Sequence, residues 1–223
     1  MSAKAPSPAD RAALRRLGDA VRARLATDPG VHRIAVTGAD LYAVGQFLSV
    51  AECARFIALT DSVAEPSRTY DHGTQSNYRT SWSGDVDRAD AFVRMIERRI
   101  DDLTGIDPAW GETVQGQRYH PGQEFREHHD WFHTTGAYWP EEASRGGQRS
   151  WTAMVYLNDV TAGGETVFPK LGATITPQQG ALLLWNNANA DGTPNPLTLH
   201  AALPVIEGAK YVITKWYRTR PWG

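Results

Sequence analysis

From Thr113 onward the sequence breaks into short segments of strand-forming residues separated by turn residues, and this pattern limits the fold more than any other feature. The turns contain Pro-Gly, Gly-Gly and Asn-rich sequences. Regular short strands joined in this way are typical of antiparallel sandwiches and barrels. Strands are predicted over 114–119, 124–129, 152–157, 173–176, 181–185, 197–203 and 211–217. The second half of the chain is therefore predicted to form a jelly-roll-like core.

The first half of the chain favours helices. Ser7 and the proline after it are typical of a helix N-terminus, and a capping box at 49–52 predicts a second helix reaching about residue 61. A third helix is predicted from near residue 87 to Gly105, because glycine commonly ends helices. We expect a single domain with three parts: an N-terminal helical extension (1–32), a helical support region (33–112) and a catalytic core (113–223).

Composition excludes several classes of protein. A net charge of −2, from 23 basic and 25 acidic residues, provides no basic field for nucleic acid or anionic lipid. The longest apolar stretch, 181–185, is too short to cross a membrane, and the N-terminus lacks the apolar block of a secretory signal. The single cysteine, Cys53, rules out an internal disulfide or a Cys-based zinc site. We therefore expect a cytoplasmic protein that binds neither nucleic acid nor membrane.

Two histidines and one aspartate are candidate metal ligands. His128 and Asp130 are two residues apart on a predicted strand, so their side chains share a face. That pair alone fits a solvated strand face better than a metal site. His200, in another apolar segment, would by itself be interpreted as a core residue. Together the three form the set that binds non-heme Fe(II) on one face, with zinc as the competing ion.

Lys210 begins the apolar segment 211–217. A lysine at the head of a strand is usually exposed to solvent. If it faces inward, its ammonium group requires an anion, and a dicarboxylate cosubstrate would supply one.

With these residues, the chain resembles the prolyl 4-hydroxylase-like family of Fe(II)- and 2-oxoglutarate-dependent dioxygenases from about residue 40 to 218. That family has a double-stranded β-helix (jelly-roll) core, so the resemblance implies an α+β fold with N-terminal flanking helices. The matching motifs, in the family's order, are Arg79-Thr80-Ser81, the segment 96–100, Arg118 to Gln123, His128-His129-Asp130-Trp131-Phe132, Arg149 to Asn158, Gly163 to Pro169, Leu199-His200, Pro204-Val205, Gly208, Lys210 and Trp216.

The resemblance implies that His128, Asp130 and His200 ligate iron. It also implies that Lys210 pairs with the distal carboxylate of 2-oxoglutarate and that Tyr119 donates its hydroxyl to the same carboxylate. As a simpler interpretation, Tyr119 would be a core aromatic residue.

Further residues are implied to lie around the cosubstrate and substrate. Thr166 and Trp216 would lie near the cosubstrate or substrate pocket, and Arg149 on the strand that lines the substrate groove. Trp216 as a core aromatic and Arg149 as a surface charge are the alternatives. We expect the substrate to enter between two long segments, 133–147 and 186–196, and to contact Arg149 and Trp139.

The resemblance implies a dioxygenase that uses Fe(II), 2-oxoglutarate and O2, with ascorbate as reductant, to hydroxylate an unactivated C–H bond while 2-oxoglutarate becomes succinate. The carboxylate of Asp130 favours hydroxylation over halogenation. Phe125 departs from the family, because many relatives carry tyrosine there. The expected substrate is a prolyl residue in a peptide or protein, with a free amino acid or other small molecule as the alternative. A non-catalytic jelly-roll binding module and a zinc hydrolase are the rival classes, and the sequence leaves the oligomeric state open.

Overall fold

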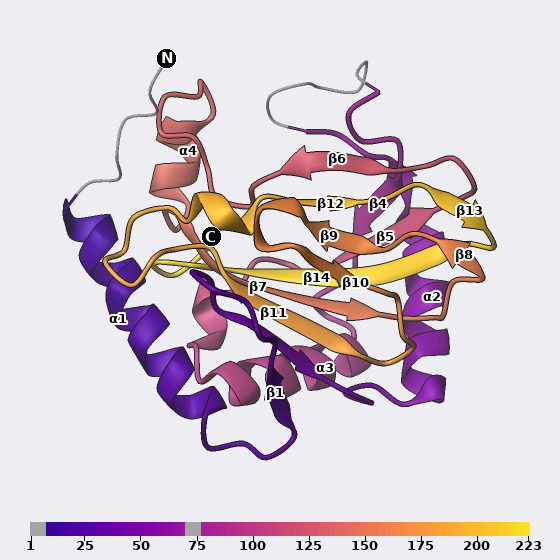
Figure 1. Ribbon diagram of the computed structural model, residues 1–223, viewed down its shortest axis with the longest axis horizontal. Coiled ribbons are helices and arrows are strands. Elements are labelled where there is room, and N and C mark those ends of the chain that lie inside the picture. The colour runs from indigo at the N-terminus through magenta and orange to yellow at the C-terminus, as the bar shows by residue number, and fades with distance from the viewer. Residues whose placement is uncertain (1–7, 70–76) are drawn as a thin grey trace.

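Two facing β-sheets and a layer of helices form the computed structural model, which describes residues 8–69 and 77–223 (Figure 1). The α-helices are α1 (Pro8–Leu25), α2 (Val50–Val63), α3 (Ala91–Thr104) and α4 (Trp139–Ser144). Single 3₁₀ turns are η1 (Pro108–Trp110), η2 (Pro169–Leu171) and η3 (Pro196–Thr198).

The larger sheet has eight antiparallel strands. In spatial order they are β1 (Val31–Arg33), β2 (Leu41–Val44), β11 (Leu182–Asn186), β7 (Arg149–Tyr156), β14 (Lys210–Arg218), β5 (Gln115–Tyr119), β4 (Trp82–Asp85) and β3 (Glu65–Pro66). The smaller sheet has the order β10 (Ala173–Ile175), β9 (Thr166–Phe168), β12 (His200–Ala202) and β6 (Phe125–His128). A separate pair joins β8 (Ala162–Gly163) to β13 (Val205–Glu207). The α+β jelly-roll prediction is confirmed.

Local signals in the sequence account for the helix ends. The predicted capping box begins α2: the Ser49 side chain accepts from the Glu52 backbone N–H, and the Glu52 carboxylate accepts from the Ser49 N–H. Gly105 ends α3 in the left-handed conformation. That helix begins later than predicted, because the Asp90 side chain caps it. The predicted N-cap residue Ser7 lies outside the described residues.

The support region, residues 33–112, is less helical than predicted. Its strand β2 pairs with β11, and β4 pairs with β5, so this region extends the large sheet at both ends. These strands are short, and β4 has the sequence Trp-Ser-Gly-Asp, without alternating apolar residues. Such short strands form because the neighbouring strand offers unpaired backbone groups, and no local pattern reveals that.

Alternate residues of β7 and β14 face two separate hydrophobic cores. On β7, Trp151 and Val155 pack in the core shared with the helices, while Met154 and Tyr156 pack in the core between the two sheets. Helices α1, α2 and α3 lie on the side of the large sheet away from the small one (Figure 1). Side chains that point between the sheets can therefore meet side chains of the small sheet.

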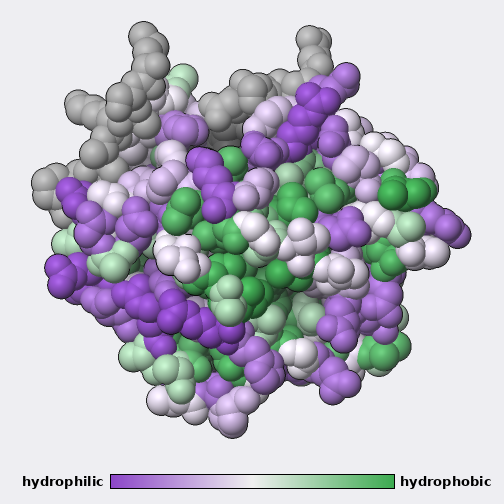
Figure 2. Space-filling model, in the orientation of Figure 1, coloured by the Kyte–Doolittle hydropathy of each residue, from purple (hydrophilic) through white to green (hydrophobic). Residues whose placement is uncertain are grey.

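The surface in the orientation of Figure 1 is mixed. Hydrophobic side chains reach the surface over its middle and are enclosed by hydrophilic ones (Figure 2). The helical spacing of Phe92, Met95 and Ile96 predicts that all three are buried, but Met95 is 48% exposed. Within residues 8–69 and 77–223, no helix is long and apolar enough to cross a membrane.

Gly192 fixes the contact between the segment after β11 and α1. Its φ is +80°, and an added Cβ would lie 2.0 Å from the Arg11 carbonyl oxygen. We expect Gly192→Ala to lower the free energy of unfolding by about 3 kcal/mol, measured by urea denaturation. Gly122 is the matched control: its φ is +81° with nothing within 4 Å of an added Cβ. Gly122→Ala should cost only about 1 kcal/mol, and equal losses would contradict the role of the clash.

Candidate active site

The three candidate metal ligands come together in the small sheet. His128 ends β6 and His200 begins β12, and their Cα atoms are direct partners in the antiparallel pairing of these strands. Asp130 follows β6 by two residues. One ligand atom from each of the three side chains lies within 4.8 Å of the others.

Hydrogen bonds fix the two imidazole rings. Nδ1 of His128 lies 2.8 Å from the Arg126 carbonyl oxygen, and Nδ1 of His200 lies 3.0 Å from the Thr198 carbonyl oxygen. Because a carbonyl only accepts, both rings carry their proton on Nδ1 when neutral. The two Nε2 atoms lie 3.8 and 3.9 Å from Oδ1 of Asp130. Both Nε2 lone pairs and one carboxylate oxygen therefore converge, and this donor set fits Fe(II).

The charge states of His128 and Asp130 also suit a metal. Burial, together with the neighbouring His200, holds the pKa of His128 well below its ordinary value, so the ring is neutral. Burial alone would raise the pKa of Asp130, but the two histidines, the Arg149 charge and a hydrogen bond from Thr152 lower it overall. The group is therefore a carboxylate beside neutral imidazole, the protonation state in which these side chains bind metals.

Phe125 covers one face of the ligand His128. The two rings are stacked with centroids 3.5 Å apart and an angle of 13° between their planes. The Arg79 guanidinium lies 4.7 Å from the Phe125 ring centroid. Both residues line a pocket that His128 and Asp130 also line. Phenylalanine, at the position where many relatives carry tyrosine, thus places an apolar ring against the imidazole of His128.

Lys210, at the start of β14, is a buried cation. It is 1% exposed, and its Nζ donates a 3.3 Å hydrogen bond to Thr166 Oγ1. Among the described residues, no carboxylate lies within 4.0 Å of its Nζ. Burial lowers the pKa of Lys210 to about 7, against the opposing charge of Glu165. A buried ammonium group without a counter-ion is suited to binding an anionic ligand.

A narrow pocket between the sheets connects Lys210 with the three candidate ligands. The residues implied to contact the cosubstrate all line it: Tyr119, Thr166, Lys210 and Trp216. The Tyr119 hydroxyl donates to Gln117 Oε1 at 2.9 Å, so a contact with a bound carboxylate requires this hydroxyl to change partner. The residues predicted from the resemblance therefore line one cavity together with the three candidate metal ligands.

A larger pocket of about 650 Å³ lies on the outer side of His128 and Asp130. Arg149 and Trp216 are in its wall, with the Arg149 guanidinium 4.0 Å from the Trp216 ring centroid. Trp139 is not among the lining residues; it is the first residue of α4, and the adjacent Tyr138 lines the pocket. The predicted long loop 133–147 therefore contains a short helix.

The second predicted covering segment, 186–196, contributes no residue to the wall of this pocket. It packs against α1, where Arg11 forms a 2.9 Å ion pair with Asp191. His129 approaches its end, with Nε2 3.3 Å from the Pro196 carbonyl oxygen. The segment leads to His200 along the chain, as predicted, but it does not border the larger pocket.

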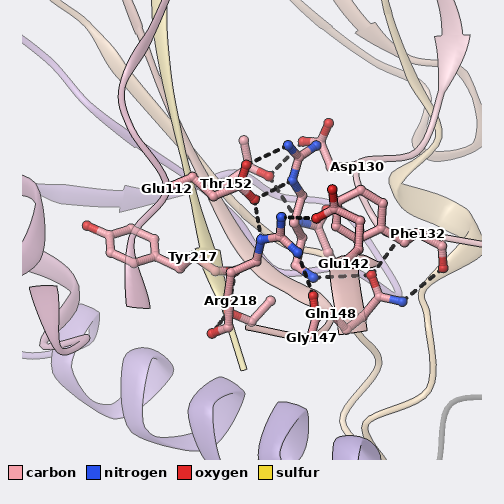
Figure 3. A network of polar contacts seen from close by, with 12 residues as sticks. Glu112, Asp130, Phe132, Glu142, Gly147, Gln148, Thr152, Tyr217 and Arg218 are labelled. Carbon is pink, nitrogen blue, oxygen red and sulfur yellow. Dashed lines mark hydrogen bonds and ion pairs between the residues drawn. The ribbon is translucent and has the colours of Figure 1, made fainter. Parts of the chain in front are cut away.

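The sequence did not reveal a buried ionic network around Glu112, Glu142 and Arg218 (Figure 3). This network also holds Arg149. Glu112 accepts from Arg149 Nε at 2.6 Å and Nη2 at 2.7 Å, and Arg218 Nε donates to the same carboxylate. Arg218 also pairs with Glu142 of α4 and donates to the Gly147 carbonyl oxygen at 2.6 Å. Glu112, Glu142 and Arg218 belong to no motif, and only their packing indicates a role.

Comparisons with known proteins agree with this geometry. The sequence model described as the 2OG-Fe(II) oxygenase superfamily matches residues 114–218. The chain is 34% identical over 196 residues to probable prolyl 4-hydroxylase 4 of Arabidopsis thaliana, covering 76% of this chain and 64% of the relative. It is 32% identical over 201 residues to probable prolyl 4-hydroxylase 6 of the same plant, covering 79% of this chain and 68% of the relative. The chain thus spans about two thirds of the length of these relatives.

A solved structure is also similar. The viral collagen prolyl hydroxylase vCPH from Paramecium bursaria Chlorella virus-1, crystallised as a 2OG complex, aligns with a TM-score of 0.62 and 25% identity. The alignment covers 80% of this chain and 94% of the viral protein.

Proposed function

Because the chain belongs to the 2OG-Fe(II) oxygenase superfamily, we propose that it is a dioxygenase that hydroxylates a prolyl residue in a peptide or protein. One observation carries this proposal: His128, Asp130 and His200 share a buried pocket with the unpaired cation Lys210. A non-catalytic binding module has no need of all four. The names of the relatives favour a prolyl substrate, and a free amino acid or other small molecule is the alternative within the same chemistry.

His128, His200 and Asp130 would hold the Fe(II) ion. When bound, Fe(II) with O2 supplies the oxidation that converts 2-oxoglutarate to succinate and CO2 and hydroxylates the substrate C–H bond. Each ring would offer its Nε2 atom, because its Nδ1–H donates a hydrogen bond to the carbonyl oxygen of Arg126 or Thr198.

Lys210 would bind the distal carboxylate of 2-oxoglutarate. Its ammonium group is already fixed by Thr166, so pairing with the carboxylate requires little loss of side-chain freedom. The surrounding aromatic rings of Tyr119 and Tyr156 exclude water and thereby strengthen the pairing. The cosubstrate is thereby oriented with its other end toward the metal ligands.

On the substrate side, Arg149 would donate hydrogen bonds into the larger pocket. Glu112 binds two of its nitrogen atoms, and the Trp216 ring supports the face of the guanidinium group. The Arg149 guanidinium is therefore held in one position, from which it would donate a hydrogen bond to a carbonyl oxygen of the peptide substrate. We also propose ascorbate as the reductant that restores Fe(II), a role that a requirement for ascorbate over many turnovers would support.

A turnover assay tests the proposed function. The protein, supplied with Fe(II), ascorbate and 2-oxoglutarate, is expected to release succinate slowly alone and faster with a proline-containing peptide. Mass spectrometry should find one added oxygen on a prolyl residue. Stimulation by free proline and not by peptide would favour the small-molecule alternative, and the absence of any succinate would contradict the dioxygenase assignment.

The affinity for 2-oxoglutarate should depend on pH through Lys210. The pKa of its ammonium group is about 7, so it is charged below pH 7 and increasingly neutral above it. Both carboxylates of the ligand stay ionised throughout this range. We expect the Kd, measured under argon, to be about tenfold higher at pH 8 than at pH 6. Pyruvate lacks the distal carboxylate and is the control; the same pH dependence for pyruvate would assign the effect to another group.

A further inference from the structure

Asp130 is oriented from the opposite sheet, unlike the two histidines. His128 and His200 are held by carbonyl groups two residues earlier in their own segments. The Asp130 carboxylate instead accepts a 2.6 Å hydrogen bond on Oδ2 from the Thr152 hydroxyl of β7, in the large sheet (Figure 3). Its Oδ1 is the oxygen that faces both histidine Nε2 atoms. The Thr152 hydroxyl therefore decides which carboxylate oxygen is available to a metal.

The direction of this hydrogen bond follows from counting protons. The ionised Asp130 only accepts, so Thr152 must donate its single hydroxyl proton to it. Any further partner of the Thr152 oxygen must then be a donor. Asn187 provides one, with its Nδ2 at 2.9 Å from Thr152 Oγ1. A flipped Asn187 amide would place an oxygen against an oxygen with no proton left between them.

Asn187 is itself held firmly. Its backbone N–H donates to the Ser150 carbonyl oxygen at 2.8 Å, and its own carbonyl oxygen accepts from the Asn195 N–H at 3.0 Å. Thr152 is 0% exposed and Asn187 is 1% exposed. Asn187 Oδ1 is buried and makes no hydrogen bond among the described residues. The backbone hydrogen bonds of Asn187 thus fix the position of its side-chain amide. The NH2 group of that amide makes the hydrogen bond to Thr152.

We propose that Thr152 and Asn187 are positioning residues that hold Asp130 so that it binds the metal through Oδ1 alone. The Asn187 NH2 group donates to the Thr152 hydroxyl oxygen. The hydroxyl proton of Thr152 is then directed to Oδ2 of Asp130. Without this chain of two hydrogen bonds, the carboxylate can rotate and present either oxygen or both. The inference rests on the proposed function, because it assumes that a metal binds to these three ligands.

Binding of Co(II) alone tests the inference without any turnover. Affinity is measured by titration calorimetry, and ligand geometry by the visible absorption spectrum of the Co(II) protein. Thr152→Val keeps the shape but loses the hydroxyl, and should weaken Co(II) binding about 10- to 100-fold with an altered spectrum. Thr152→Ser restores the hydroxyl and should bind within about threefold of wild type. Asn187→Leu should weaken binding and change the spectrum in the same direction as Thr152→Val.

Thr60→Val is the matched control for the loss of a buried hydroxyl. Thr60 is 0% exposed, lies in α2, and its Oγ1 has no hydrogen-bond partner among the described residues. This variant should bind Co(II) as wild type does. Wild-type affinity and spectrum in both Thr152→Val and Asn187→Leu, or a Thr152→Ser variant as weak as Thr152→Val, would overturn the positioning role alone. Failure of the wild-type protein to bind Co(II) would overturn the proposed metal site as well.

Discussion

Replacing His200 with alanine is expected to lower succinate release about 10³-fold or more, because the metal contributes several kcal/mol of transition-state stabilisation. The same loss is expected for His128→Ala and Asp130→Ala, since their ligand atoms converge within 4.8 Å. Each variant should also lose Co(II) binding in calorimetry. Their circular dichroism spectra should match that of wild type, because each change removes a polar group from the end of a strand and leaves both cores intact.

His32→Ala is the control for these variants. His32 is an exposed residue of β1, at the outer edge of the large sheet, and its loss should leave turnover unchanged. Retention of Co(II) binding in His200→Ala would contradict the ligand assignment. In that case, a structure with the ion held by His129 and His133 would identify the alternative site.

Replacing Lys210 with alanine is expected to weaken 2-oxoglutarate binding by about 30-fold or more. The variant loses the charge-assisted pairing of a buried ammonium group with a carboxylate, worth about 2–5 kcal/mol. The apparent KM for 2-oxoglutarate in the succinate assay measures this effect. Binding of pyruvate should change little, because pyruvate has no distal carboxylate to lose a partner.

The stability of the Lys210→Ala variant separates loss of binding from loss of fold. Without an anion, the buried Lys210 has no carboxylate within 4.0 Å in the described part of the chain, and burial disfavours its charged form. Its removal should therefore not lower the Tm of the ligand-free protein by much. Lys170, exposed on η2, is the control, and Lys170→Ala should match wild type. An unchanged KM in Lys210→Ala would show that another residue binds the distal carboxylate.

The sequence was informative where structure depends on neighbouring residues. The capping box at Ser49 and the left-handed Gly105 were predictable because each involves hydrogen bonds or dihedral angles within one turn. His128 and Asp130 do lie close together as predicted, but β6 ends at His128 and Asp130 lies two residues beyond it, so the two-residue strand period is not what brings them together. The roles of Lys210 and Tyr119 came from family resemblance, which carries information from other folded chains.

The sequence was less informative at the margins of the fold. The strand β4, next to the edge of the large sheet, was missed because its pairing with β5 depends on a distant partner. Trp139 was expected to contact the substrate, yet the turn into α4 places the adjacent Tyr138 in the pocket wall. A shift of one residue changes the direction of a side chain, and a loop sequence does not specify that direction.

By itself, the sequence determined the fold class, the two-residue spacing of His128 and Asp130, and the positions of the family motifs, because these depend on local geometry. Only the tertiary structure decided that His200 lies directly opposite His128, through the register of β6 and β12. It also decided that Glu112 holds Arg149 and that Thr152 holds Asp130. Those contacts join residues 22 to 72 positions apart in the sequence. Their partners are fixed by how the two sheets pack face to face, which involves the whole core.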